Sequence, residues 1–158
     1  MKCWQEGLLA QVRPGSFGKK KSGEYRFCVD YQKLNEITIK DVYPLPRIDD
    51  TLDALGGSRL FSALDLKNGY WQVEIDERDR EKTAFITPNG LYHFNVMPFG
   101  LCNAPATFER LMDSILRTLP FEMCLCYIDD VIIFSQDFES HLERLEKVLV
   151  CIREAGLK

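Results

Sequence analysis

The chain has 158 residues, a length that fits one domain or one piece of a larger protein. Hydrophobic residues make up 46% and charged residues 28%, the composition of an ordinary globular protein that can bury a core. The net charge of −4 argues against broad attraction to nucleic acid, although Lys19-Lys20-Lys21 forms a basic cluster with Arg26 nearby. Such a cluster is most often a solvated loop, so composition leaves the partner open.

Targeting and cysteine patterns favour an intracellular, cytoplasmic protein that makes no membrane contact. The longest apolar runs are far shorter than the ~20 residues that span a bilayer, and the N-terminal residues lack the apolar core of a secretory signal. Six cysteines are present, but only Cys124 and Cys126 are close together, and their spacing is not that of a zinc loop. We expect structural thiols in a reducing compartment.

The first sixty residues contain a loose leading segment, one strand and one helix. Residues 1–18 show no clear period, and a basic turn over 19–23 precedes a strand predicted at 25–31 by strict alternation of apolar residues. Pro44 and Pro46 predict an extended path over 41–46. A short helix follows, with Ile48, Leu52 and Leu55 on one stripe and Gly56-Gly57 as its stop.

The middle of the chain predicts strands joined by tight turns. A strand at 60–65 ends in Asp65, and a turn at Lys67-Asn68-Gly69 leads to a second strand at 70–75. Residues 76–82 predict a charged turn, and Pro88-Asn89-Gly90 predicts a hairpin between 83–87 and 91–97.

The last third predicts helix, hairpin and helix. Asn103 is a plausible N-cap of a helix at 104–119, whose apolar stripe comprises Phe108, Leu111, Met112, Ile115 and Leu119. The apolar runs 123–126 and 131–134 predict a hairpin, and a helix at 138–155 should turn Leu142, Leu145, Val148, Leu149 and Ile152 inward. This order predicts an α+β fold, a split βαβ arrangement whose antiparallel sheet carries helices on one face.

Three carboxylates stand at strand ends. Asp129 and Asp130 join two apolar runs, and Asp65 closes a third. Adjacent acids repel each other and resist desolvation, so this arrangement favours a divalent cation that supplies positive charge. Two Mg²⁺ ions held there would activate an attacking hydroxyl and neutralise a leaving pyrophosphate. In the plainer alternative each Asp serves its own turn, bonding the backbone two residues on.

The acidic turn and other short blocks resemble one enzyme family. Tyr127-Ile128-Asp129-Asp130 resembles the Tyr-x-Asp-Asp box of reverse transcriptases. The other blocks occur in the family's order: Arg26-Phe27-Cys28-Val29-Asp30-Tyr31-Gln32-Lys33-Leu34-Asn35, Tyr43-Pro44-Leu45-Pro46-Arg47-Ile48, Phe61-Ser62-Ala63-Leu64-Asp65-Leu66 with Gly69-Tyr70, Lys82-Thr83-Ala84-Phe85, and Val96-Met97-Pro98-Phe99-Gly100-Leu101 with Asn103-Ala104-Pro105-Ala106-Thr107-Phe108. Residues 19–158 are thus similar to the polymerase region of a gypsy-type LTR retrotransposon Pol polyprotein.

The resemblance implies a reverse-transcriptase-like palm with partial fingers and an RNA-directed DNA polymerase activity. Such an enzyme transfers nucleotides from dNTPs to a primer 3′-hydroxyl on an RNA or DNA template. Asp65, Asp129 and Asp130 match the family's catalytic acids, which bind two Mg²⁺ ions, with Mn²⁺ as a substitute. Tyr70 matches the aromatic residue that excludes a 2′-hydroxyl, and Gly69 would let the backbone approach the sugar.

The resemblance also implies nucleotide contacts from the fingers. Arg26 matches the arginine that lies over the nucleotide, and Lys20 or Lys21 falls near the lysine that binds the terminal phosphate. Phe99 stands where many retroviral enzymes carry glutamine. The two histidines, His93 and His141, match no catalytic position and are expected at the surface or in a hairpin.

The implied domains are a leading segment, 1–18, that matches nothing, and a fingers–palm domain over 19–158. The fingers would take about 19–60 and 76–100, and the palm about 60–75 and 101–158. The thumb, connection and RNase H parts are expected to be absent from the chain, which would then be a fragment that depends on them. Two alternatives remain open: a catalytically inactive retroelement relic, and a metal-dependent nuclease that uses the same acids.

Overall fold

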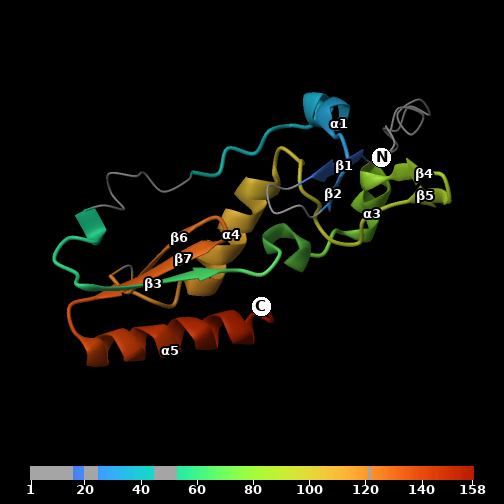
Figure 1. The fold of residues 1–158 in the computed structure, drawn as a ribbon. Helices are drawn as coiled ribbons and strands as arrows, with labels where there is room; N and C mark the ends of the chain where they lie inside the picture. Colours follow the sequence, from blue (N-terminus) through green and yellow to red (C-terminus); the bar gives the residue numbers. More distant parts are fainter. Residues whose placement is uncertain (1–15, 20–24, 45–52, 121) are drawn as a thin grey trace. The chain divides into compact units, whose positions relative to one another are not determined.

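The computed structural model describes residues 16–19, 25–44, 53–120 and 122–158 (Figure 1). The chain divides into two compact units. The first unit comprises Met1–Lys40 and Val73–Ala104, and the second comprises Asp41–Gln72 and Pro105–Lys158. In the ranges expected from the sequence, the fingers give way to the palm near residue 60, whereas the second compact unit already begins at Asp41. None of the described helices is long and apolar enough to cross a membrane.

The first unit contains two small hairpins and short helices. Its elements are β1 (Ser16–Lys19), β2 (Tyr25–Cys28), α1 (Gln32–Ile37), α3 (Glu77–Arg80), η3 (Glu81–Thr83), β4 (Phe85–Thr87) and β5 (Gly90–Tyr92). β1 pairs with β2, and β4 pairs with β5, both antiparallel. The aromatic ring of Phe85 packs against the rings of Phe27, Tyr92 and Phe94, and its centroid lies 5.1–6.0 Å from theirs.

The strand predicted at 25–31 stops at Cys28 because the backbone turns into α1. The Asp30 carboxylate accepts the backbone N–H of Gln32 at 2.9 Å, a local bond that competes with strand pairing. Tyr31 is then buried, and its hydroxyl donates to the carbonyl of Thr83 at 3.2 Å. Helix α1 was not predicted.

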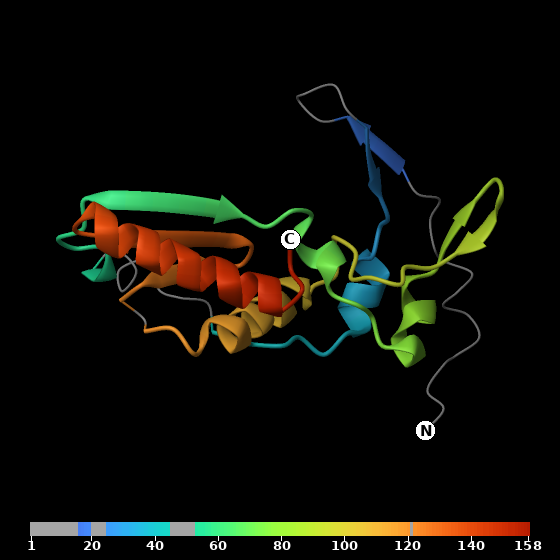
Figure 2. The same ribbon diagram turned by 90° about the horizontal axis from the view of Figure 1, so that it is seen from below.

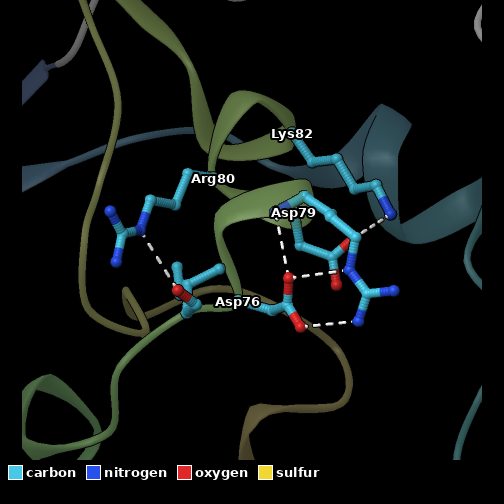
Figure 3. A network of polar contacts seen from close by, with 6 residues as sticks. Asp76, Asp79, Arg80 and Lys82 are labelled. Carbon is cyan, nitrogen blue, oxygen red and sulfur yellow. Dashed lines mark hydrogen bonds and ion pairs between the residues drawn. The ribbon is translucent and has the colours of Figure 1, made fainter.

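The charged turn predicted over 76–82 is helical, because its charges are arranged to cap a helix (Figure 3). Asp76 caps α3 by accepting the backbone N–H of Arg78, and it also binds the Arg78 guanidinium at 2.8 Å. Those bonds hold the pKa of the Asp76 carboxyl well below its usual range. Lys82 forms an ion pair with Asp79 in the next turn.

Two further strand predictions are wrong or too long. Residues 69–72 form a 3-10 helix, η2 (Gly69–Gln72), so the strand predicted at 70–75 does not form. Only Glu74 pairs, in an isolated bridge with Val96. The predicted 83–87 and 91–97 hairpin is limited to β4 and β5.

The second unit is built on a three-stranded antiparallel sheet in the order β3-β7-β6 (Figure 2). Among the described residues, this unit also contains two long helices and η2. The bounds are β3 (Leu60–Asp65), α4 (Ala104–Leu116), β6 (Cys124–Tyr127), β7 (Asp130–Ser135) and α5 (Phe138–Glu154). The sequence predicted β3, the β6–β7 hairpin and both long helices. The predicted α+β class is confirmed.

Helix α5 packs on the sheet face that contains Ser62, Val131 and Ile133. His141 anchors it there: Nε2 lies 2.8 Å from Ser62 Oγ, and Nδ1 lies 3.1 Å from Ser135 Oγ. His141 is therefore buried, and its predicted surface position is wrong. His93 is exposed, as expected.

The inward face of α5 is narrower than predicted. Val148 and Ile152 are buried, but Leu142 and Leu149 are 49% and 47% exposed. The helix is covered on one side by the sheet, so only residues that share the face of His141 are buried.

Helix α4 buries Phe108 and Met112, two members of the predicted apolar stripe, and also Leu116, which the predicted stripe did not include. The helix ends three residues earlier than 119. Its outer face binds the preceding extended segment. Tyr43 donates to Asp113 at 2.6 Å, and Arg110 donates to Asp41 at 2.6 Å while lying over the Tyr43 ring. The hydrogen bond to Asp113 raises the pKa of Tyr43. The start of the helix predicted before Gly56-Gly57 lies outside the described residues.

Candidate active site

Asp65 and Asp130 stand directly opposite each other across β3 and β7. The two residues are the last matched pair of the antiparallel register, and both side chains are exposed. Directly opposed residues project from the same face of a sheet, so two negative charges are placed side by side there. Like charges in this arrangement destabilise the sheet, which makes a counter-charge favourable.

Asp129 belongs to the tight turn between β6 and β7. Tyr127 pairs with Asp130, which leaves Ile128 and Asp129 as a two-residue hairpin loop. Ile128 has a φ of +58°, a left-handed conformation that β-branched residues rarely adopt. In two-residue hairpins this position normally holds glycine or asparagine. The turn that carries the acids is therefore strained, as backbone at functional sites often is.

The loop that follows β3 also contacts this turn. The backbone N–H of Leu66 donates to the carbonyl of Asp129 at 3.2 Å. Gly69 is buried with a φ of +39°, and a Cβ atom added there would stand 3.1 Å from Asp129 Oδ2. A side chain at residue 69 would thus displace Asp129, and glycine is required for both space and backbone conformation.

Tyr70 lies next to this loop, in η2, and is half-buried. Its ring meets Phe108 edge to face, with centroids 5.6 Å apart. Burial, and to a smaller extent the charge of Asp129, raise the pKa of the Tyr70 hydroxyl. The phenol is therefore neutral at ordinary pH and presents a flat ring beside the acids.

The three acids fit a divalent cation in chemistry and in backbone position. They offer only carboxylate oxygens, the ligands that Mg²⁺ prefers, and β3 and β7 bring their main chains together. Their side chains do not converge: in the part of the chain that the structure describes, no three acidic, histidine or cysteine side chains form a metal-binding group. Ion binding would require the carboxylates to rotate toward one another.

The remaining predicted site residues belong to the first unit or lie outside the described residues. Arg26 is part of β2, and Phe99 is 44% exposed. Lys20 and Lys21 lie outside the described residues. The geometry of the acidic turn is thus formed by residues of the second unit alone.

Glu109 of α4 was not among the predicted site residues, and it is completely buried. Its Oε2 accepts the backbone N–H of Ile128 at 2.6 Å. A signal was present, because Glu109 is spaced three and seven residues from the buried Met112 and Leu116 and so shares their helix face. An ionisable residue on an apolar stripe calls for a partner.

Comparison with known proteins shows which family the sequence matches. Residues 18–158 match the family described as reverse transcriptase (RNA-dependent DNA polymerase). The Retrovirus-related Pol polyprotein from transposon 297 of Drosophila melanogaster is 47% identical over 146 residues, which are 92% of this chain and 14% of that protein. The Pol polyprotein from transposon gypsy of the same organism is 44% identical over 133 residues, 84% of this chain and 13% of that protein.

A plant virus protein and solved structures are also similar. The enzymatic polyprotein of cauliflower mosaic virus (strain CM-1841) is 40% identical over 139 residues, 88% of this chain and 20% of that protein. The crystal structure of prototype foamy virus protease-reverse transcriptase covers 90% of this chain and 19% of its own, with a TM-score of 0.75 and 28% identity. The foamy viral enzyme in complex with an RNA/DNA hybrid covers the same shares, with a TM-score of 0.76 and 25% identity. The chain thus spans a fifth or less of each of these proteins.

Proposed function

Because the chain belongs to the reverse transcriptase family, we propose that it is the catalytic core of an RNA-directed DNA polymerase. The observation that carries the proposal is the pairing of Asp65 with Asp130 beside the strained turn that presents Asp129. In the reaction the primer 3′-hydroxyl loses its proton to solvent and its oxygen bonds to the α-phosphorus of a dNTP. The bond between that phosphorus and the oxygen bridging to the β-phosphorus breaks, and pyrophosphate leaves with the electron pair.

Asp65, Asp129 and Asp130 would hold the two Mg²⁺ ions of this reaction, with Mn²⁺ as a substitute. When bound, such ions lower the pKa of the attacking hydroxyl and neutralise charge on the departing pyrophosphate. The chain's own contribution is to fix the carboxylates. The β3–β7 register places Asp65 against Asp130, while Leu66 and Gly69 limit the positions open to Asp129.

Tyr70 would select deoxyribose over ribose. Its ring is held against Phe108 and stands beside the Gly69 backbone, close enough to Asp129 for that charge to raise its pKa. A rigid aromatic ring below the sugar would occupy the volume that a 2′-oxygen needs. Gly69 would let the backbone approach the same sugar.

Arg26, Lys20 or Lys21, and Phe99 would bind the rest of the nucleotide. Arg26 offers a planar guanidinium that suits stacking and phosphate contact, and Lys20 or Lys21 offers a mobile point charge for the terminal phosphate. Phe99 would contact the nucleotide through its exposed ring. These roles follow from the family's motif positions.

The partners would be an RNA or DNA template with its primer, dNTPs and the other parts of a Pol polyprotein. The relatives are polyproteins several times longer than this chain, and a structural relative was solved with an RNA/DNA hybrid. A cytoplasmic location, inside the particle of the parent element, is part of the same proposal.

Primer extension tests the proposal. The assay compares this chain with a chimera in which it replaces the matching segment of the transposon 297 polyprotein, on an RNA template with Mg²⁺ and dNTPs. We expect the chimera to extend the primer and the isolated chain to add few nucleotides. Asp129→Asn should abolish extension, whereas Asp53→Asn, an exposed acid elsewhere in the second unit, should not. Full activity of Asp129→Asn would refute the assignment, and template cleavage without dNTPs would point to a nuclease.

A further inference from the structure

The turn that carries Asp129 needs an external support. Ile128 is the first central residue of the loop and adopts a φ of +58°. A β-branched residue in that region costs of order 1–3 kcal/mol and persists only where surrounding contacts impose it. The contacts made by Ile128 therefore decide where the acids stand.

Glu109 supplies the support from α4. Its Oε2 accepts the Ile128 backbone N–H at 2.6 Å, a bond across 19 residues of sequence. Ile128 lies in the two-residue loop, beyond the last strand pair, so the strand pairing provides no acceptor for its N–H. The Ile128 carbonyl is also engaged, by the thiol of Cys126 at 3.5 Å. Glu109 therefore holds the peptide before the Ile128 Cα, and Cys126 contacts the peptide after it.

The other oxygen of the same carboxyl is unused. Glu109 is completely buried, and Oε1 has no hydrogen-bond partner among the residues that the structure describes. A buried polar atom without a partner costs roughly 1–3 kcal/mol. A helix selected only for stability would carry an apolar side chain here, so the carboxyl is retained at the expense of stability.

We propose that Glu109 is a positioning residue for polymerisation, holding Ile128 in its left-handed conformation and thereby keeping the backbone of Asp129 beside the Asp65–Asp130 pair. The inference rests on the proposed function, because the placement of Asp129 matters only if the three acids act together. It does not make Glu109 a ligand or a catalytic group: its contact is with the backbone N–H of Ile128.

The hydrogen bond of Glu109 does not depend on its charge. Burial raises the pKa of its carboxyl, the Ile128 N–H opposes that rise, and the negative charge of Asp113 adds to it. Whether protonated or ionised, the carboxyl keeps an oxygen that can accept the Ile128 N–H. An amide of the same shape can make the same bond.

Two substitutions separate positioning from packing. Glu109→Gln keeps the length and an acceptor oxygen, and should retain kcat within about threefold because the Ile128 N–H stays bonded. Glu109→Met keeps the length and removes the acceptor. It should lower kcat by roughly 10- to 100-fold, the effect of a small displacement of catalytic groups, with little change in the KM for dNTP.

Stability should not fall in step with activity. Glu109→Met removes the unpartnered Oε1 but leaves the Ile128 N–H without its acceptor, and because these two effects oppose each other the melting temperature should change little. A residue that served only the fold would lose stability and activity together. Met112→Leu, a repacking of the buried residue one turn along α4, is the matched control and should leave kcat unchanged.

Amide exchange gives a readout that does not need polymerase activity. In the ¹⁵N-labelled chain, the Ile128 N–H should be protected in the unchanged protein and in Glu109→Gln, and should exchange at least about tenfold faster in Glu109→Met. If the unchanged chimera makes no product, the proposed function fails while this measurement still decides the role of Glu109.

Two outcomes overturn the inference. One is a Glu109→Met enzyme with unchanged kcat and a protected Ile128 amide. The other is equal loss of kcat and melting temperature in Glu109→Gln and Glu109→Met, which would reduce Glu109 to a packing residue.

Discussion

Asp65 and Asp130 are the last pair of directly opposed residues in the antiparallel pairing of β3 with β7. Two like charges so placed destabilise the sheet in the absence of a cation. A cation that binds only the folded chain offsets this cost and adds stability by mass action.

Asp65→Asn should therefore change stability in a metal-dependent way. Without divalent ions the variant should melt about 1–4 °C above the unchanged chain, because one of the opposed charges is gone. Added Mg²⁺ should raise the melting temperature of the unchanged chain and leave the variant nearly unaffected. Thermal unfolding with EDTA and with Mg²⁺ measures both effects; equal Mg²⁺ stabilisation of the two proteins would contradict metal binding at Asp65.

Gly69→Ala should disturb the site by crowding the Asp129 carboxylate. The new Cβ would lie 3.1 Å from Asp129 Oδ2, on a backbone with a φ of +39°. Polymerase activity of the chimera should fall by about 10²-fold, because the carboxylate must move.

Gly156→Ala is the control for that experiment. Gly156 also has a positive φ, +75°, but a Cβ there would meet nothing within 4 Å. Both variants should lose about 1 kcal/mol or more of stability from backbone strain, yet only Gly69→Ala should lose activity. Comparable activity in the two variants would show that the approach to Asp129 is unimportant.

Tyr70→Val should relax sugar selection. Removing the ring held against Phe108 opens the space beside Gly69, so the preference for dNTPs over ribonucleotides should fall by about tenfold or more. Tyr70→Phe keeps the ring and should keep the preference. Single-nucleotide incorporation with each substrate gives the ratio, and an unchanged ratio in Tyr70→Val would remove the proposed role.

Asp137 should make the stability of α5 depend on pH. The Ser140 backbone N–H and hydroxyl donate to its carboxylate at 2.9 and 2.7 Å and lower its pKa below the ordinary value of 3.8. A group whose folded-state pKa is lowered contributes fully above its unfolded pKa, and loses that contribution as the pH falls through the folded value.

Asp137→Asn keeps a capping oxygen without the charge. Its deficit in melting temperature should be present at neutral pH and should shrink as the pH falls below about 4, where the unchanged chain becomes protonated. Unfolding curves from pH 7 to pH 2.5 test this. A deficit that stays constant over that range would show that the carboxylate charge adds nothing.

Local sequence patterns predicted the elements that are long and periodic, or that have clear turn residues at their ends. Helices α4 and α5, strand β3 and the hairpin around Asp129 follow from apolar spacing and from turn residues that no tertiary contact overrides. The family was identifiable for a related reason, since its short motifs are contiguous in the sequence.

Segments that depend on distant partners were mispredicted. Residues 70–75 alternate like a strand, but Tyr70 packs on Phe108 instead, and only Glu74 finds a strand partner. His141 shares the helix face of Val148 and Ile152, but its polar partners Ser62 and Ser135 reach it only after the sheet has formed.

The sequence by itself determined which acids the chain has, which short motifs surround them and which family those motifs match. Only the tertiary structure decided that Asp65 opposes Asp130 and that Glu109 supports Ile128. The physical reason is that both relationships depend on strand register and helix packing between residues far apart in the chain, whereas the spacing of a motif reports only neighbours.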